Sequence, residues 1–147
     1  MSDRLPLHRQ ETSYSCGPAC LRMVLELFGV LKEEGDLRAL CDSTYFGTDA
    51  VLLVQAARDL GFEGTRKYSM GFADLQRQLE RGVFPIVYIR TRLSANGPAQ
   101  MHSVVVIKAT EDDVHVNDPW RGEYVFPSAQ FLREWAASHD LTIIVER

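Results

Sequence analysis

The sequence predicts an α+β fold in which a helical N-terminal half packs on an antiparallel β-sheet formed by the C-terminal half. In the first half, apolar residues recur at helical spacing, as in Leu21, Val24, Leu25 and Phe28. The second half carries short runs rich in β-branched and aromatic residues, separated by turn-forming residues. Helices and strands that are segregated along a chain are typical of α+β folds.

The composition is that of one globular domain, which we expect to span residues 1–147. Hydrophobic residues make up 46% of the chain and charged residues 24%, which is ordinary for a globular protein. The formal net charge is −4 and the basic residues are scattered, so nucleic acid is not an expected partner. We expect no cofactor and no bound metal.

The beginning of the chain lacks the apolar core of a signal peptide. No apolar run reaches the ~18 residues that a membrane span needs. The cysteines are odd in number, namely Cys16, Cys20 and Cys41, which argues for reduced thiols rather than a disulfide framework. We therefore expect a cytoplasmic protein that does not insert into a membrane.

Each element is placed by its apolar spacing and by the turn residues that flank it. Helices are predicted near residues 17–28, 33–41, 49–61, 72–81 and 128–137, with Thr48 or Asp49 as the cap of the third. Strands are predicted near residues 64–68, 84–90, 101–109, 114–117, 122–126 and 141–145. Residues 92–100 are predicted to be a loop, the last strand is expected to close the sheet, and the sheet is expected to pack on the first helix.

Cys16 stands directly before Gly17 and Pro18, at the start of the first predicted helix. Proline suits the first helical turn, where its missing N–H costs nothing. The positive end of a helix favours thiolate over thiol, and thiolate is the reactive form. The competing interpretation is a small buried residue, which many free cysteines are. The position makes Cys16 a candidate nucleophile.

A thiolate nucleophile needs a base, and His102 is the best placed of the four histidines. It opens the most hydrophobic predicted strand, directly after a Gly-Pro loop. His8 and His139 lie in polar segments, and His115 alternates with two valines and so is expected to face solvent. A histidine satisfied within the core is the alternative interpretation of His102.

The imidazole needs an acceptor that orients it, and two neighbours compete for that role. The turn at residues 112–113 brings residues near 118 back beside His102, so Asp118 and Asn117 are both candidates. They face opposite sides of the strand, so only one can serve. Gln10 is a candidate donor to an oxyanion together with the backbone N–H of Cys16, although a lone Gln in a polar segment is ordinarily just solvated.

Taken together, Gln10, residues 16–21 (CGPACL), residues 102–105 (HSVV) and residues 117–119 (NDP) resemble the C39 peptidases, papain-like cysteine proteases that process double-glycine leader peptides. The resemblance implies a papain-like α+β fold with Cys16 as nucleophile and His102 as general base and acid. It further implies that Asp118 orients His102 and that Gln10 serves the oxyanion hole. Many family members carry Asp where this chain has Ser15.

The resemblance implies hydrolysis of a peptide bond through a Cys16 thioester, after small residues such as Gly-Gly of a leader peptide. The expected partners are a peptide or protein substrate and an export or transporter component acting in trans. Three alternatives stay open: acyl transfer from the same thioester, a peptide-binding module without turnover, and a metal site of Cys16, Cys20 and His102. The aromatic candidates for the cleft walls are Tyr14, Tyr45, Phe46 and Trp120.

Overall fold

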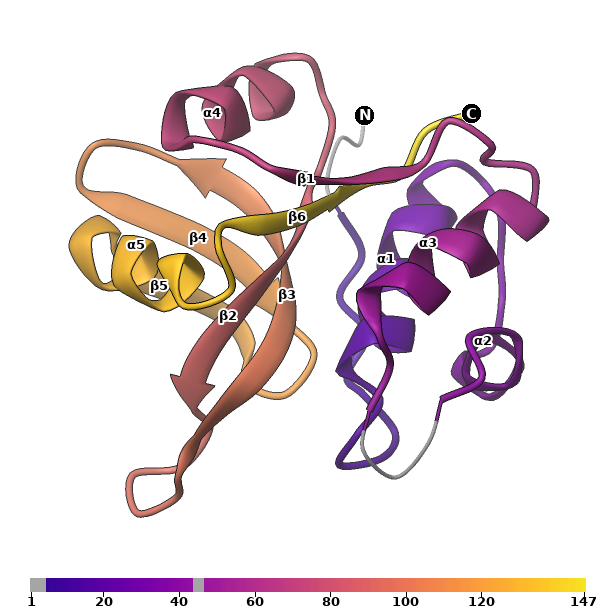
Figure 1. The fold of residues 1–147 in the computed structure, drawn as a ribbon, viewed down its shortest axis with the longest axis horizontal. Coiled ribbons are helices and arrows are strands. Elements are labelled where there is room, and N and C mark those ends of the chain that lie inside the picture. Colours follow the sequence, from indigo (N-terminus) through magenta and orange to yellow (C-terminus); the bar gives the residue numbers. More distant parts are fainter. Residues whose placement is uncertain (1–4, 44–46) are drawn as a thin grey trace.

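The computed structural model describes residues 5–43 and 47–147, and its helices and strands follow the predicted order (Figure 1). The helices are α1 (Cys16–Leu27), α2 (Glu34–Leu40), α3 (Ala50–Asp59), α4 (Phe72–Glu80) and α5 (Ser128–Ala136). The strands are β1 (Arg66–Ser69), β2 (Ile86–Arg92), β3 (Ala99–Ala109), β4 (Asp113–Asp118), β5 (Gly122–Pro127) and β6 (Leu141–Ile144). The α+β class is confirmed.

The six strands form one sheet in the order β1-β6-β2-β3-β4-β5, and every neighbouring pair is antiparallel. The last strand, β6, does not close the sheet as expected. It lies inside the sheet, between β1 and β2, where Ile143 pairs with Lys67 and Ile86. This position buries Thr142 and Ile143, because an internal strand is covered from both sides.

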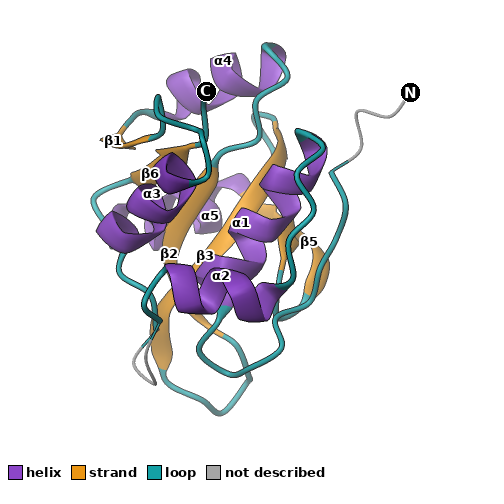
Figure 2. Cartoon of the chain, turned by 90° about the vertical axis from the view of Figure 1, so that its right-hand side faces the viewer, coloured by secondary structure: helices purple, strands orange, loops and turns teal. Residues whose placement is uncertain are grey.

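The helices α1, α2 and α3 cover one face of the sheet, as Figure 2 shows from that side. Alternate residues of β2, among them Ile86 and Tyr88, turn toward these helices and share a core with Leu21 and Leu25 of α1. The alternation is the period of a strand, whose successive side chains point to opposite faces. The prediction that the sheet packs on the first helix is therefore confirmed.

The opposite face of the sheet is covered by α4 and α5. Val87 and Ile89 of β2 point this way and share a second core with Leu75 of α4 and Trp135 of α5. These helices were predicted, but nothing in the sequence indicated on which face they lie. The result is three layers, with the sheet buried on both sides, so its central strands hold side chains rigidly.

The hairpin of β2 and β3 is longer than predicted. The pairing continues through Thr91↔Gln100 to Arg92↔Ala99, so the predicted loop of residues 92–100 shrinks to residues 93–98. Asn96, Gly97 and Pro98 mark only the turn itself. The extended hairpin projects beyond the sheet (Figure 1) and supplies one wall of the cavity described below.

A buried carboxylate fastens the segment that leads into α1. Glu34 is fully buried, accepts the backbone N–H of Glu11 at 2.8 Å and pairs with Arg38 Nε at 3.0 Å. Residues 11–15 then run directly to Cys16 at the beginning of α1. Since a buried charge is stable only when it is paired, Glu34 holds this segment in one position.

Replacing Glu34 with alanine is expected to lower the free energy of unfolding by about 2 kcal/mol, because the Glu11 N–H loses its buried acceptor and Arg38 loses one of its two carboxylate partners. Urea denaturation measures the change. The matched control is Glu33→Ala, one residue away, whose side chain is 77% exposed and should cost less than about 0.5 kcal/mol. Equal losses in the two variants would contradict the assignment.

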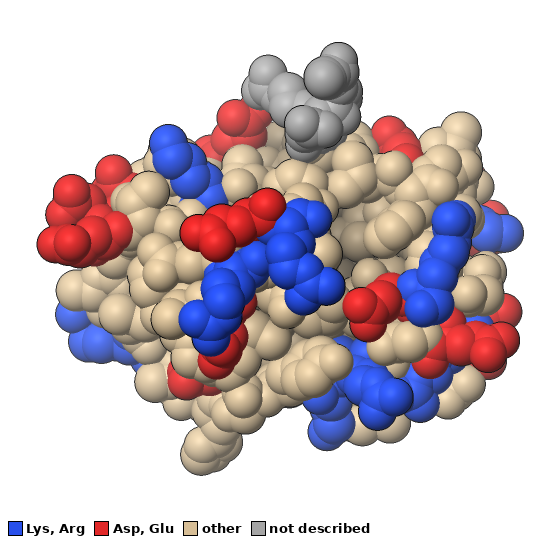
Figure 3. All heavy atoms as spheres, turned by 90° about the horizontal axis from the view of Figure 1, so that it is seen from above, with Lys and Arg blue, Asp and Glu red and all other residues tan. Residues whose placement is uncertain are grey.

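No helix in the described parts of the chain is both long and apolar enough to cross a membrane. Figure 3 shows the molecule from above, with basic and acidic side chains interspersed over that face. The scatter follows from the sequence, in which the 16 basic and 20 acidic residues form no long run of one sign.

Candidate active site

Cys16 is the first residue of α1 and is partly exposed. The residue before it, Ser15, is fully buried and accepts the backbone N–H of Thr12 at 3.1 Å. In the first helical turn Pro18 has no N–H and Ala19 N–H donates to the Ser15 carbonyl at 3.1 Å, so the N–H groups of Cys16 and Gly17 are the ones that can face an anion beside the thiol. The loop and the helix start thus present Cys16 as the sequence predicted.

His102 and Asp118 meet across the β3–β4 pair. His102 Nε2 lies 2.7 Å from Asp118 Oδ1, and both side chains are almost fully buried. The register explains the contact. Asn117 pairs with Val105, so Asp118 lies opposite Val104 and reaches diagonally to His102, two residues earlier in β3. Asn117 faces the other way and donates to the Leu5 carbonyl at 3.2 Å. The structure thus brings Asp118, and not Asn117, to the imidazole.

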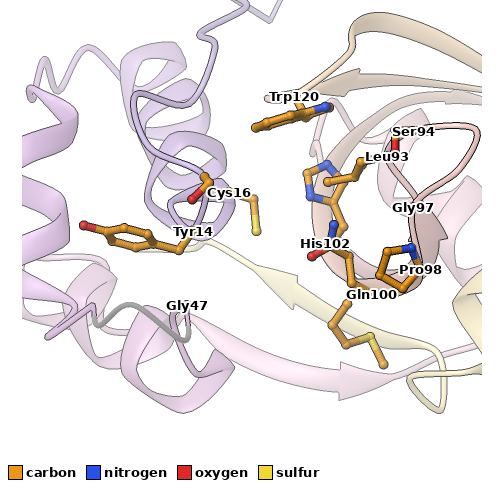
Figure 4. A pocket seen from close by; sticks show the side chains of 12 residues that line it. Tyr14, Cys16, Gly47, Leu93, Ser94, Gly97, Pro98, Gln100, His102 and Trp120 are labelled. Atoms are coloured by element: carbon orange, nitrogen blue, oxygen red, sulfur yellow. The ribbon is translucent and has the colours of Figure 1, made fainter.

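The other side of the imidazole faces the thiol, because the Cys16 sulfur points toward the His102 ring (Figure 4) and each group shifts the pKa of the other. Because Nε2 is engaged by Asp118, the ring nitrogen toward Cys16 is Nδ1. The three side chains therefore form a continuous chain of contacts from α1 through β3 to β4. Each comes from a different element, so the packing of α1 on the sheet creates the arrangement.

The charges along this chain stabilise one another. Burial opposes ionisation of all three groups, but the mutual contacts outweigh it. Hydrogen bonds to His102 and Ser103 and the attraction of His102 lower the pKa of Cys16 below its usual value. Contacts with Asp118 and Cys16 raise the pKa of His102 to about 9. Contacts with His102 and Arg121 lower the pKa of Asp118 to about 2. These shifts favour a thiolate–imidazolium pair over the neutral thiol and imidazole.

Two further residues contact these groups and had no functional assignment from the sequence. Ser103 lies close enough to Cys16 to lower the pKa of its thiol, and its hydroxyl accepts a long contact of 3.7 Å from the Cys20 thiol. Arg121 donates from Nε to Asp118 Oδ2 at 2.6 Å. The position of Ser103 directly after His102 was the sequence signal that could have placed it in the site. The sequence around Arg121 is typical of an ordinary turn and gave no such signal.

Gln10 lies beside the site but does not line the cavity that contains Cys16. Its side-chain Nε2 donates to the Thr12 carbonyl at 2.7 Å, and its backbone N–H donates to the Pro119 carbonyl at 2.8 Å. Both contacts fix Gln10 next to the loop that follows Asp118. A carboxamide carries two N–H groups, so the bond to Thr12 leaves one for a ligand.

A cavity of about 490 Å³ opens over Cys16 and His102 (Figure 4). Of the aromatic residues predicted as cleft walls, Tyr14 and Trp120 line it, while Tyr45 and Phe46 lie outside the described residues. The β2–β3 hairpin supplies the facing wall, with Leu93, Ser94, Gly97, Pro98, Gln100 and Met101. The cavity is large enough for several residues of an extended peptide.

The metal site considered from the sequence does not form in the described residues. Across residues 5–43 and 47–147, no three His, Cys, Asp or Glu side chains gather in a way that could hold a metal ion. Cys20 is fully buried one helical turn below Cys16, and burial raises the pKa of its thiol well above the usual value. Cys20 is therefore packed beneath the site, and Cys41 is buried in the core with α1 to α3.

Comparison with known proteins identifies the family. The model of the Peptidase C39 family matches residues 4–146, nearly the whole chain. The chain belongs to the Peptidase C39 family. The resemblance drawn from Gln10, Cys16, His102 and Asp118 is thereby confirmed at the level of the family.

Two relatives illustrate the range of the C39 family. The chain is 33% identical over 130 residues to the transport/processing ATP-binding protein ComA of Streptococcus pneumoniae, a match that covers 86% of the chain and 17% of ComA. It is 32% identical over 114 residues to an uncharacterized protein of Methanothermobacter marburgensis, covering 78% of the chain and 71% of that protein. The chain therefore spans only a small part of ComA.

Solved structures of C39 domains share the fold. The peptidase domain of Streptococcus ComA, described as a bifunctional ABC transporter involved in quorum sensing, superposes with a TM-score of 0.80 at 26% identity. That match covers 98% of this chain and 100% of the domain. A double glycine motif protease from an AMS/PCAT transporter, solved in complex with the leader peptide, gives a TM-score of 0.77 at 24% identity. That match covers 98% of this chain and 92% of the protease.

Proposed function

We propose that this C39 chain is a cysteine peptidase that hydrolyses a peptide bond through a thioester on Cys16. The observation that carries the proposal is the chain of contacts from Cys16 through His102 to Asp118 beside an open cavity. A nucleophile, a base and a group that orients the base are the parts that covalent hydrolysis requires. The names of the relatives, peptidase domain and processing protein, support the same reaction.

In the first step, the Cys16 thiolate attacks the carbonyl carbon of the scissile bond and forms a C–S bond. The carbonyl oxygen becomes an oxyanion, which the Cys16 backbone N–H and the free N–H of Gln10 stabilise. The imidazolium of His102 then gives its Nδ1 proton to the nitrogen of the leaving peptide. The C–N bond breaks, and the acyl group stays on Cys16 as a thioester.

In the second step, neutral His102 takes a proton from a water molecule as the water oxygen attacks the thioester carbon. The C–S bond breaks, the peptide leaves as a carboxylic acid, and Cys16 returns as a thiolate beside protonated His102. Asp118 keeps its charge throughout and holds the imidazole in the tautomer and orientation that both steps need.

Gln10→Ala is expected to lower kcat about 10- to 1,000-fold with little change in KM, because the amide would stabilise the oxyanion and not the ground state. Steady-state hydrolysis of a peptide measures both constants. Gln55→Ala, a change on the exposed side of α3, is the matched control and should leave them unchanged. An unaltered kcat in Gln10→Ala would remove Gln10 from the oxyanion hole and leave the Cys16 N–H alone in that role.

We further propose that the substrate is the leader of an exported peptide and that the cut follows Gly-Gly. Tyr14 and Trp120 both line the cavity, and the Trp120 ring lies close to Cys16 and His102 (Figure 4), so residues without large side chains fit best next to the scissile bond. Relatives that carry out processing also carry out transport, as the ComA name states. We therefore propose an export component as the partner that brings substrate to this chain.

The test is incubation with peptides that contain Gly-Gly, analysed by mass spectrometry, beside matched peptides with Val-Val at the same place. Cleavage after Gly-Gly with uptake of one water supports the proposal. Transfer of the acyl group to an added amine in preference to water would identify an acyltransferase. Binding of the peptide without any product would identify a peptide-binding module and overturn the proposal.

A further inference from the structure

The two oxygens of the Asp118 carboxylate contact two different cationic side chains, His102 and Arg121. Oδ1 accepts from His102 Nε2 at 2.7 Å, from the Trp120 N–H at 2.7 Å and from the Arg121 N–H at 3.2 Å. Oδ2 accepts from Arg121 Nε at 2.6 Å. The side chain of Asp118 is completely buried. One oxygen thus serves the imidazole, and the other is bound to a guanidinium.

Arg121 is held in place from its other side by aromatic rings. Its guanidinium carbon lies 4.3 Å from the centroid of Tyr124 and 5.2 Å from that of Phe126, distances at which a cation is attracted to a ring face. The side chain is only 16% exposed. Within the part of the chain that the structure describes, its Nη2 is buried without a hydrogen-bond partner. The Arg121 guanidinium is therefore largely shielded from solvent and lies within the site.

We propose that Arg121 is a positioning residue that cancels the charge of Asp118, so that the two side chains together act on His102 as a neutral hydrogen-bond acceptor. This inference rests on the proposed peptidase function. A bare buried carboxylate would stabilise the imidazolium strongly but would repel the thiolate beside it. Paired with Arg121, Asp118 keeps its geometry while its field at Cys16 is reduced.

Several charged and titratable groups of the described residues lie around this pair. Cys20 of α1 feels the charge of Asp118, His102 of β3 contacts Asp118, and Tyr124 of β5 contacts the Arg121 guanidinium. Cys16 of α1 interacts with His102, and Tyr88 of β2 feels the charge on Cys16. Arg9 of the N-terminal segment contacts the Trp120 carbonyl, so its charge lies at the outer end of the same loop. Arg121, like the His102 imidazolium, contacts Asp118 directly.

The proposal predicts opposite effects for the two members of the pair. Removing the cation in Arg121→Met leaves the carboxylate unbalanced, so the thiolate of Cys16 becomes harder to form. Removing the anion in Asp118→Asn leaves the cation unbalanced, so the thiolate becomes easier to form. The double variant Asp118→Asn/Arg121→Met is again neutral and keeps an acceptor oxygen for His102. Arg121→Lys retains the charge and is the matched control.

The experiment measures the rate of Cys16 alkylation by iodoacetamide against pH, with thermal melting to show that each variant is folded. We expect the midpoint of the acid limb to rise by about half a pH unit or more in Arg121→Met and to fall in Asp118→Asn. The double variant and Arg121→Lys should return close to the wild-type midpoint. A purely structural role of Arg121 would lower the melting temperature without these shifts of opposite sign.

The outcomes separate this inference from the proposed function. If wild-type Cys16 alkylates like an ordinary thiol, the thiolate–imidazolium pair is absent and the proposed function fails. If the wild-type midpoint is low but Arg121→Met leaves it unchanged, only the role of Arg121 is overturned. The role of Arg121 would also be overturned if the midpoint shifted as far in Arg121→Lys as in Arg121→Met. The same holds if the midpoint of the double variant stayed away from the wild-type value.

Discussion

Replacing Cys16 with alanine is expected to abolish peptide hydrolysis, and His102→Ala is expected to lower kcat by about 10⁴-fold or more. The thiolate forms the bond to the substrate, and the imidazole moves every proton, so neither step proceeds without both. The loss should appear in kcat, since the cavity that binds the peptide is otherwise intact. Hydrolysis of a Gly-Gly peptide, followed by mass spectrometry, measures the effect.

Two substitutions serve as controls for this loss. Cys41→Ala removes a thiol that is buried in the core of α1 to α3, and His115→Ala removes a histidine of β4 that lines a different hollow. Both should retain hydrolysis within a few-fold once folding is verified by circular dichroism. Substantial hydrolysis in Cys16→Ala would mean that the chemistry is located elsewhere in the molecule.

The second large effect is the pH dependence of kcat/KM, which should be bell-shaped. On the acid side, protonation of the thiolate removes the nucleophile, and this limb lies below the usual thiol pKa because His102 and Ser103 lower the pKa of Cys16. On the alkaline side, His102 loses the proton that the leaving amine needs, and this limb lies near pH 9. Below the acid midpoint and above the alkaline midpoint, kcat/KM should fall about tenfold per pH unit.

The sign of each limb follows from the direction of its shift. The raised pKa of His102 extends the imidazolium to higher pH than a free histidine allows, and the lowered pKa of Cys16 extends the thiolate to lower pH. Asp118, with its pKa lowered to about 2, stays ionised across the whole range and adds no limb. An alkaline limb near the usual histidine value of about 6.5 would contradict this assignment.

The site could be predicted from the sequence where local signals position a residue. Pro18 marks the start of a helix, so the exposure of Cys16 at that start follows from the neighbouring residues. The short turn after β3 returns β4 beside His102, so a partner at Asn117 or Asp118 could be foreseen, and the family resemblance favoured Asp118. In both cases the geometry depends on residues close in the sequence. The shift in register between Val106 and Lys108, which gives Asp118 the face that contacts His102, left no signal in the sequence.

Other features depend on contacts that leave no local signal. The position of β6 between β1 and β2 is set by pairing over more than 50 residues, and the packing of α4 and α5 on the far face follows from the second core. Arg121 looks like a turn residue until the ring of Tyr124 and the carboxylate of Asp118 are seen on its two sides. The bond from Gln10 to Thr12 likewise could not be foreseen from a polar segment.

The central claim is that Cys16 and His102 form a thiolate–imidazolium pair, and alkylation of Cys16 tests it most directly. Iodoacetamide is added at about pH 6 to the wild type and to His102→Ala, and peptide mapping assigns the modified cysteine. We expect Cys16 alone to react, and to react at least about tenfold faster in the wild type. Equal rates in the two proteins, or reaction only near the ordinary thiol pKa of about 8.5, would contradict the account.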